Sequence, residues 1–179
     1  MTVFAETERL LLRALTLDDT NSMFELDSDP IVHRYLGNKP VRTKEEVIKY
    51  INYIQMQYEN YHIGRWAVIE KASGDFVGWS GLKNNFEHEM NGHTNFIDVG
   101  YRLIPRYWGK GYATESGIAA VNYGFETMNY DVIYGMTELD HHASRKALEK
   151  IGLTYVEDFV FEVEDLPLTW YQITNPYRK

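Results

Sequence analysis

The stretch from Asn95 to Met128 constrains the fold of this chain more than any other. It begins with a strand-like run that stops at Pro105, continues through a basic turn with Gly109 and Gly111, and becomes a run with apolar residues at helical spacing. The first N–H groups of a helix have no partner within the helix, so this succession presents them beside the turn. Helix N-termini of this kind bind anions, and the pattern therefore predicts a phosphate-binding turn between a strand and a helix.

Two better-known phosphate-binding loops do not fit this turn. A Walker A loop needs Gly-Lys followed by Ser or Thr, whereas Lys110 is followed by Gly111. A dinucleotide-binding turn needs an early strand-helix-strand unit and a small residue at the position of Thr114. What remains is Arg106, the two glycines, which allow close backbone approach, and Lys110. A turn that merely needs glycine explains the same residues, and the sequence alone leaves both interpretations open.

The composition predicts one domain over residues 1–179. A chain of 179 residues with 44% hydrophobic residues can bury one sizeable core, and its lack of cysteine excludes disulfides and thiolate metal sites. No run is apolar and long enough for a membrane span, so we expect a cytoplasmic protein without a membrane partner. The net charge of −8 disfavours nucleic acid as a partner. His88 and His93 lack metal-ligand spacing, so we expect both histidines to be solvated and expect no metal. We also expect a monomer or a homodimer.

The hydrophobic pattern predicts a mixed sheet of about seven strands flanked by about four helices, in an α/β or α+β arrangement. Local signals set several boundaries: Pro30 breaks the first helix, Thr43 and Glu46 form a capping box for the second, and Gly152 ends the fourth. Period-two patterns place the strands at 9–13, 66–69, 76–82, 95–104, 132–137, 155–163 and 168–174, and helical spacing places the helices at 18–26, 43–58, 113–128 and 144–151.

These motifs together resemble the GCN5-related N-acetyltransferase (GNAT) superfamily, in the branch that contains the ribosomal-protein alanine N-acetyltransferases of the RimJ/RimL type. The resemblance covers nearly the full length and rests on five segments, which are residues 6–13, Ser28-Asp-Pro30, Val99-Gly-Tyr101, Arg106-Tyr-Trp-Gly-Lys-Gly-Tyr-Ala-Thr-Glu115 and Ala143–Leu153. It implies a single-domain GNAT fold and acetyl-CoA as cosubstrate.

The resemblance also implies a binding site for acetyl-CoA. The pyrophosphate would rest on backbone N–H groups of the turn, which is formed by Trp108, Gly109, Lys110, Gly111, Tyr112 and Ala113, with Arg106 adding charge. The pantetheine arm would pair with the strand edge at Tyr101, Arg102 and Leu103. His141 stands where the family usually has an asparagine that contacts the pantetheine, so its role departs from the family pattern.

The catalytic residues implied by the resemblance are Asp98 and Ser144. Amine acetylation needs a base, an oxyanion donor and a group that protonates the leaving thiolate. Asp98 matches an acidic position that relatives use as a base, directly or through water, and an exposed strand carboxylate is its alternative reading. Leu148 occupies the position of the usual tyrosine general acid, so Ser144 would instead donate a hydrogen bond to the thiolate sulfur. The alternative is that Ser144 only caps the helix. Glu138 and His142 are reserve bases.

We therefore expect an acetyl-CoA-dependent N-acetyltransferase that works by direct attack in a ternary complex. Its acceptor would be a primary amine, either a protein N-terminus, such as that of a ribosomal protein, or a small amine. By the resemblance, aromatic residues of the early helices and the last hairpin would line the acceptor pocket, namely Tyr50, Tyr53, Tyr58, Tyr61, Trp170 and Tyr171. The alternative is a non-catalytic acyl-CoA-binding or sensor domain, which would retain the loop but would not catalyse acetyl transfer.

Overall fold

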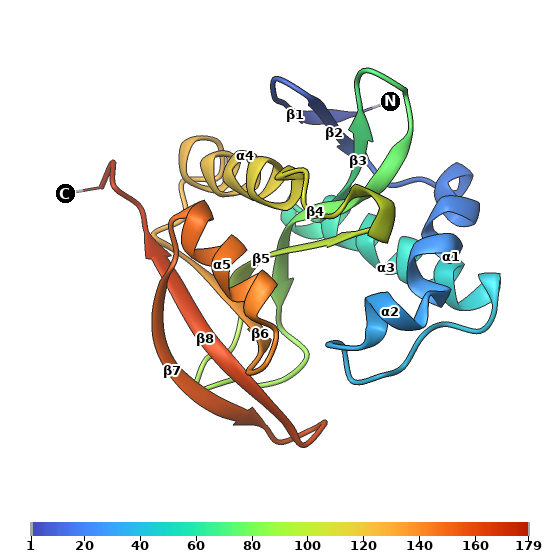
Figure 1. The fold of residues 1–179 in the computed structure, drawn as a ribbon. Helices are drawn as coiled ribbons and strands as arrows, with labels where there is room; N and C mark the ends of the chain where they lie inside the picture. Colours follow the sequence, from blue (N-terminus) through green and yellow to red (C-terminus); the bar gives the residue numbers. More distant parts are fainter. Residues whose placement is uncertain (1, 179) are drawn as a thin grey trace.

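A computed structural model describes residues 2–178 of the chain (Figure 1). Its strands are β1 (Val3–Glu6), β2 (Leu10–Ala14), β3 (Arg65–Glu70), β4 (Phe76–Asn85), β5 (Phe96–Leu103), β6 (Val132–Glu138), β7 (Thr154–Phe161) and β8 (Leu166–Thr174). Its helices are α1 (Thr20–Ser28), α2 (Pro30–His33), α3 (Lys44–Tyr61), α4 (Tyr112–Glu126) and α5 (His142–Ile151), with the short 3-10 helices η1 (Leu17–Asp19) and η2 (Pro105–Tyr107).

The eight strands form one mixed sheet in the order β1-β2-β3-β4-β5-β6-β8-β7. Neighbours are antiparallel except β5 and β6, which are parallel and share one paired position, Asp98 with Tyr134. Strands β4 and β5, by contrast, pair continuously from Gly78–Leu103 to Asn85–Phe96. The sheet therefore opens between β5 and β6 beyond Asp98, and this opening positions the candidate site.

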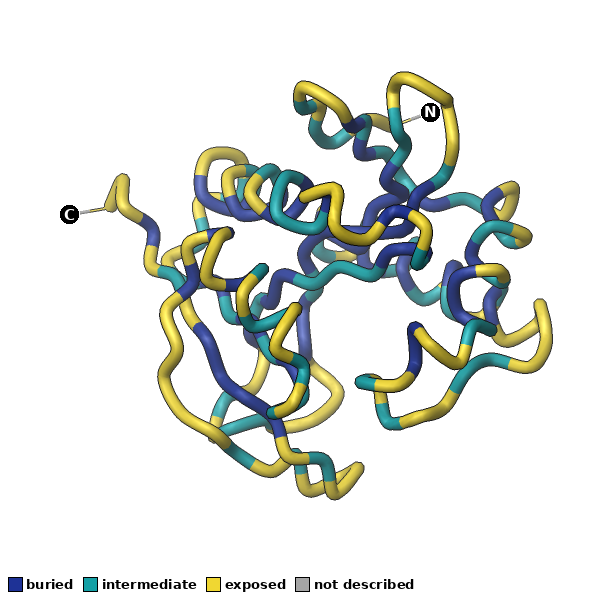
Figure 2. Tube along the Cα trace, in the orientation of Figure 1, coloured by how far each residue is buried: buried dark blue, intermediate teal, exposed yellow. Residues whose placement is uncertain are grey.

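The helices lie on the two faces of the sheet (Figure 1). On one face, Tyr50 of α3 packs against Trp79 of β4, with ring centroids 6.4 Å apart. On the other face, α4 approaches β4 so closely that a Cβ on Gly124 would lie 2.9 Å from a Leu82 methyl carbon. The buried segments run through the sheet between these two helical layers (Figure 2). Among residues 2–178, no helix has the length and apolar character that crossing a membrane requires.

The predicted fold is confirmed, with eight strands in place of about seven and five helices in place of about four. Thr43 caps α3 by accepting from the N–H of Glu46, and Asp29 caps α2 by accepting from Ile31. Gly152 ends α5 in the left-handed conformation, at φ 112°. The additional strand β1 was not predicted from the hydrophobic pattern, because its four residues are held in the sheet by pairing with β2.

Two local expectations were wrong. The fourth predicted helix begins at His142, two residues before Ser144, so Ser144 lies in its first turn and is not its N-cap. The expectation of a solvated His93 also fails, because its ring stacks on Trp170 with centroids 5.1 Å apart. His88 is exposed, as expected.

Candidate active site

The edge of β5 that faces the opening is available for pairing. Val99 to Leu103 pair with β4 on one side, whereas within residues 2–178 the ladder to β6 ends at Asp98. The carbonyl of Leu103 accepts a hydrogen bond from the indole N–H of Trp108 at 2.7 Å, which closes the far end of this edge. An extended ligand with amide groups can therefore lie along Tyr101 and Arg102 as an additional strand would.

The turn after β5 has the backbone form that an anion site needs. Gly109 and Gly111 adopt φ values of 74° and 81°, in the left-handed region that favours glycine. Gly111 is the N-cap of α4. The first helical hydrogen bond runs from the N–H of Glu115 to the carbonyl of Gly111, at 3.0 Å. The N–H groups from Tyr112 to Thr114 thus have no acceptor within the helix, and Gly111 brings no side chain to cap them.

The predicted basic residues of the turn lie at the surface and have acidic partners. Arg106 forms an ion pair with Glu25 of α1, and this pairing raises the arginine pKa above its usual value. The ammonium of Lys110 lies 3.8 Å from Glu70 and 5.0 Å from the ring centre of Tyr107. An arriving phosphate would compete with these carboxylates for the two cations.

The other predicted residues of the turn divide between surface and core. Trp108, Gly109 and Gly111 are exposed, whereas the side chain of Tyr112 is buried and donates a hydrogen bond to Glu70. Tyr112 therefore offers its backbone N–H to a ligand and uses its side chain to fix the start of α4. Ala113 is half-buried at the second position of the helix.

The sequence analysis missed Arg9, which holds the turn from the neighbouring β1–β2 connection. Its guanidinium donates to the carbonyl of Lys110 at 2.9 Å and, through Nε, to Glu115 at 2.7 Å. Glu115 also accepts from the hydroxyl of Thr7 at 2.6 Å. A Cβ on Gly111 would lie 3.4 Å from the Arg9 guanidinium, so this cation borders the anion site. In the sequence, Arg9 is only an arginine before an apolar strand, and this pattern does not indicate a partner about a hundred residues away.

Ser144 and Tyr101 lie together across the opening. The hydroxyl of Tyr101 donates to the carbonyl of Ser144 at 2.9 Å, and the two hydroxyl oxygens lie 3.1 Å apart. The Ser144 hydroxyl is half-buried and belongs to α5, so this contact joins β5 to the second half of the sheet. Burial raises the pKa of Tyr101, which keeps its hydroxyl protonated and able to donate.

His141 precedes α5 and packs against the segment that follows α2. Its ring stacks on Tyr35 with centroids 4.3 Å apart, and burial lowers its pKa, which favours the neutral ring. Beside it, the N–H of Gly37 donates to the carboxylate of Glu138 at 2.9 Å. The residue that replaces the family asparagine therefore helps to connect the α2 side of the opening to the β6 side.

Asp98 is buried and holds two charge-assisted hydrogen bonds. One oxygen accepts from the guanidinium of Arg65 at 2.6 Å and the other from the amide of Asn85 at 2.7 Å. The side chains of Asp98 and Arg65 are 8% and 7% exposed, so this is an ion pair shielded from solvent. Gly100 makes it possible, because a Cβ there would lie 2.7 Å from the Arg65 guanidinium. The alternative reading of Asp98 as an exposed strand carboxylate is therefore excluded.

The remaining predicted residues are spread over both sides of β5. Arg102 extends toward α1, where it donates to Asp27 at 2.6 Å, while Leu103 is buried. Leu148 is buried in the packing of α5, and His142 is exposed at the start of that helix.

The predicted aromatic lining of the acceptor pocket is only partly placed together. Tyr58 donates to the carbonyl of Arg65 at 2.5 Å and belongs to the core, and Tyr171 faces α5, where it lies 3.2 Å from Arg145. Tyr50 and Tyr53 lie on α3 facing the sheet, with ring centroids 6.5 Å apart.

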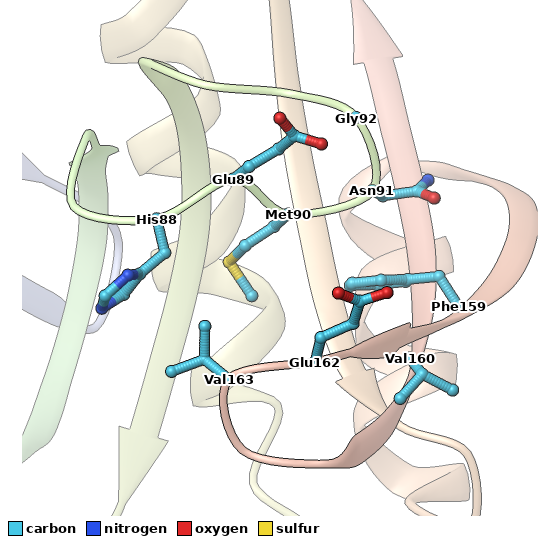
Figure 3. Close-up of a pocket in the computed structure, with 9 residues that line it drawn as sticks. All are labelled: His88, Glu89, Met90, Asn91, Gly92, Phe159, Val160, Glu162 and Val163. Atoms are coloured by element: carbon cyan, nitrogen blue, oxygen red, sulfur yellow. The ribbon is translucent and has the colours of Figure 1, made fainter.

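Loop 86–95 and the end of the β7–β8 hairpin enclose a pocket of about 450 Å³ (Figure 3). Met90 and Phe159 point into the space between loop and hairpin, and Glu89 and Glu162 supply carboxylates beside it. None of the predicted catalytic or cofactor residues in the described chain lines this pocket. It therefore lies apart from the predicted catalytic and cofactor residues.

The opened mixed sheet, with a strand-turn-helix unit beside the opening, fits the acetyltransferase fold that the sequence resembles. Residues 9–154 match the family described as the Acetyltransferase (GNAT) domain. The chain therefore belongs to the GNAT acetyltransferases. FsC-acetyl coenzyme A-N(2)-transacetylase of Aspergillus fumigatus is 31% identical over 164 residues, which cover 90% of this chain and 68% of that protein.

Solved structures share the fold over nearly the whole chain. A GNAT-family acetyltransferase from Bacillus anthracis superposes with a TM-score of 0.76 at 25% identity, covering 98% of this chain and 99% of that one. The spermidine N-acetyltransferase of Vibrio cholerae, solved with CoA and spermine, gives 0.75 at 19% identity, with 94% and 97% covered. A ribosomal-protein-S5-alanine acetyltransferase from Vibrio fischeri gives 0.73 at 16% identity, with 100% of both chains covered.

Proposed function

We propose that this protein transfers the acetyl group of acetyl-CoA to a primary amine by direct attack in a ternary complex. The observation that carries the proposal is the combination of an open β5 edge with an uncapped α4 N-terminus at its end. An acyl-CoA needs both features, because its pantetheine arm is an amide chain and its pyrophosphate is an anion.

The residues of the turn suit the pyrophosphate. The backbone N–H groups from Gly109 to Ala113 would donate to it, with Arg106, Lys110 and Arg9 supplying positive charge around them. The N–H of Trp108, which the sequence analysis included, already donates to the carbonyl of Pro105 at 3.0 Å. The β5 edge at Tyr101 and Arg102 would pair with the pantetheine amides. Bound there, acetyl-CoA supplies an activated acetyl group as a thioester.

In the reaction, the neutral acceptor nitrogen forms a bond to the acetyl carbonyl carbon, and the bond from that carbon to sulfur breaks. The amine loses a proton to a base and the thiolate gains one. A backbone N–H of β5 near Val99 or Gly100 would donate to the carbonyl oxygen as negative charge develops on it. We assign to Ser144 the role of donating a hydrogen bond to the leaving thiolate, because its hydroxyl already faces β5 through its contact with Tyr101.

Asp98 remains the proposed base, and its surroundings define how it would have to act. Both of its oxygens already accept hydrogen bonds, from Arg65 and Asn85, so a proton must arrive on a lone pair beside these donors. A bridging water satisfies this requirement better than direct contact with the amine, because the carboxylate is nearly sealed from solvent. Glu138 is the alternative base, since it is half-buried at the end of β6 with one oxygen bonded to Gly37.

The acceptor is proposed to be an α-amine or a small amine. The relatives support amines as a class, since their names include a spermidine N-acetyltransferase and a ribosomal-protein alanine acetyltransferase. Glu89 and Glu162 beside the pocket of loop 86–95 would attract the positively charged remainder of a peptide acceptor.

Release of free thiol from acetyl-CoA across a panel of amines tests the proposal. Turnover of at least one amine, with a new amide found by mass spectrometry, is the expected result. Saturable CoA binding without turnover of any amine would instead support the sensor alternative. Ser144→Ala should lower kcat more than it raises the KM for acetyl-CoA, and the opposite pattern would limit Ser144 to binding or packing.

Arg9→Ala tests the cofactor side separately. It removes the guanidinium bonds to Lys110 and Glu115, and we expect the Kd for CoA to rise about tenfold because bonds to charged groups are strong. Arg178→Ala is the matched control, since it also removes an arginine paired with an acidic residue, Asp131, but at the C-terminal end of the chain. Equal Kd values for the two variants would remove Arg9 from the site.

A further inference from the structure

Lys83 is a lysine without a partner next to the buried Asp98–Arg65 pair. It stands directly opposite Asp98 on the neighbouring strand β4, and paired residues of this kind project from the same face of a sheet. Among the contacts of residues 2–178, its ammonium makes no hydrogen bond and no ion pair within 4 Å. Lys83 is half-buried, and burial lowers its pKa, so its charge is costly where it stands.

Tyr50 of α3 presents a second polar group to the same region. Its ring packs against Trp79, on the face of β4 that also carries Lys83. Its hydroxyl also has no hydrogen-bond partner within the described residues, and burial raises the pKa of Tyr50 to about 12. Neither the hydroxyl nor the Lys83 ammonium is among the unpartnered atoms sealed from solvent. Both groups are therefore open to solvent or to a ligand, and the charges of Asp98 and Arg65 act on each of them.

The carboxylates of this region are already engaged. Asp98 is bonded to Arg65 and Asn85, and Glu87 accepts from the hydroxyl of Tyr53. Both carboxylates exert an electrostatic influence on Lys83, but neither lies within 4 Å of its ammonium. Within residues 2–178, this region of the sheet face thus offers two unused donors, an ammonium and a hydroxyl, and no free carboxylate that would match them.

Lys83 lies close to the proposed reaction centre. Asp98 marks the position where β5 and β6 separate, and Lys83 is its direct neighbour across β4. Adjacent strands are about 4.8 Å apart, so a lysine side chain on β4 is long enough to reach the start of the opening. A group bound to Lys83 would therefore be only a few bonds from an amine that attacks beside Val99.

We propose that Lys83 and Tyr50 form a carboxylate-binding subsite, so that the acceptor is an amine with a carboxylate a few bonds away, such as an amino acid. This inference rests on the proposed acetyltransferase function and specifies its substrate class. The carboxylate accepts from the ammonium and from the tyrosine hydroxyl, which supplies the missing anion. A polyamine is disfavoured at this position because it would bring a second ammonium toward Lys83.

Matched acceptors and matched variants test the subsite together. Amino acids and their carboxamides are compared with acetyl-CoA and the full chain, and rates are expressed per unprotonated amine because amidation also changes the pKa of the amine. Lys83→Met keeps the length and removes the charge, and Tyr50→Phe removes the hydroxyl. Lys49→Met is the control, since it makes the same charge change at the exposed neighbour of Tyr50 on α3.

We expect the wild type to favour the acid over its amide, and Lys83→Met to raise the KM for the acid about 10- to 100-fold, as for a lost bond to a charged group. The KM for the amide and the kcat should change little. Equal use of acid and amide by the wild type, equal losses for both in Lys83→Met, or a preference for spermidine would each overturn the subsite while leaving the acetyltransferase function intact.

A separate measurement covers the case in which no amine is acetylated, which would contradict the proposed function itself. Trp79 packs against Tyr50, so amino-acid binding in the presence of CoA should quench tryptophan fluorescence. Quenching by the acid in the wild type that is lost in Lys83→Met supports the subsite. Identical titrations of the two proteins overturn it.

Discussion

Replacing Asp98 by asparagine should destabilise the protein strongly, apart from any effect on catalysis. The Asp98 carboxylate receives donors on both oxygens, from Arg65 at 2.6 Å and from Asn85 at 2.7 Å. An asparagine keeps one acceptor oxygen and turns an N–H₂ group toward one of these donors. Arg65 is then left as a buried charge without its counter-ion.

The expected cost follows from the burial of the pair. Removing one partner of a buried ion pair costs about 3–5 kcal/mol, because the remaining charge is uncompensated. For a domain of this size about 1 kcal/mol shifts the Tm by about 2–4 °C, so the Tm should fall by about 6–20 °C. Domains of this kind have about 5–15 kcal/mol of stability in total, so Asp98→Asn should still fold at low temperature.

Urea unfolding followed by tryptophan fluorescence measures this loss. Asp131→Asn is the matched control, because it breaks the pair with Arg178, whose side chains are 67% and 44% exposed. An exposed pair contributes under about 1 kcal/mol, so this variant should resemble the wild type. If Asp98→Asn loses no more stability than Asp131→Asn, the reasoning about the buried pair is refuted. Full turnover by folded Asp98→Asn at every pH would exclude Asp98 as the base.

Three further predictions concern the opening and its supports. Tyr101→Phe should cost about 1 kcal/mol of stability and lower kcat by a smaller factor than Ser144→Ala; full activity in both variants would make this contact structural. Gly117→Ala places a Cβ 2.3 Å from Ile151 and should cost about 1–3 kcal/mol by urea unfolding, and Ile151→Val should recover part of it. Burial lowers the pKa of His141 in the folded protein, so the stability that the neutral ring contributes above pH 6.5 is lost as the pH falls through the lowered value. His141→Asn should therefore lose less Tm than the wild type between pH 7 and 5.5.

Features that depend on neighbouring residues could be predicted from the sequence. The capping of α3 by Thr43, the break at Pro30 and the glycine end of α5 follow from contacts a few residues apart. The turn around Gly109 and Gly111 was also recognisable, because a strand, a glycine-bearing turn and a helix follow one another directly.

Contacts between distant residues could not be predicted in this way. The partner of Asp98 is Arg65, 33 residues earlier, and only the paired register of three strands brings them together. Glu115 and Arg9 are 106 residues apart, and neither has a local pattern that indicates the other. A charged residue in a strand has the same sequence signal whether it faces solvent or a buried counter-ion, which is why Asp98 could be read as exposed.

The two halves of the proposed site are held by different parts of the sheet, and we expect this to separate binding from chemistry. The turn proposed to bind phosphate is held by Arg9 and Glu115 to the first half of the sheet. Ser144 belongs to the second half and meets β5 across the opening through Tyr101. Substitutions at the contacts that cross the opening should therefore change kcat at nearly constant CoA affinity, whereas substitutions at the turn should change affinity first. Tyr101, the turn and Glu115 follow one another in the sequence, whereas Arg9 and Ser144 come from distant segments. We expect binding and chemistry to divide between the two sets because β5 and β6 separate beyond Asp98.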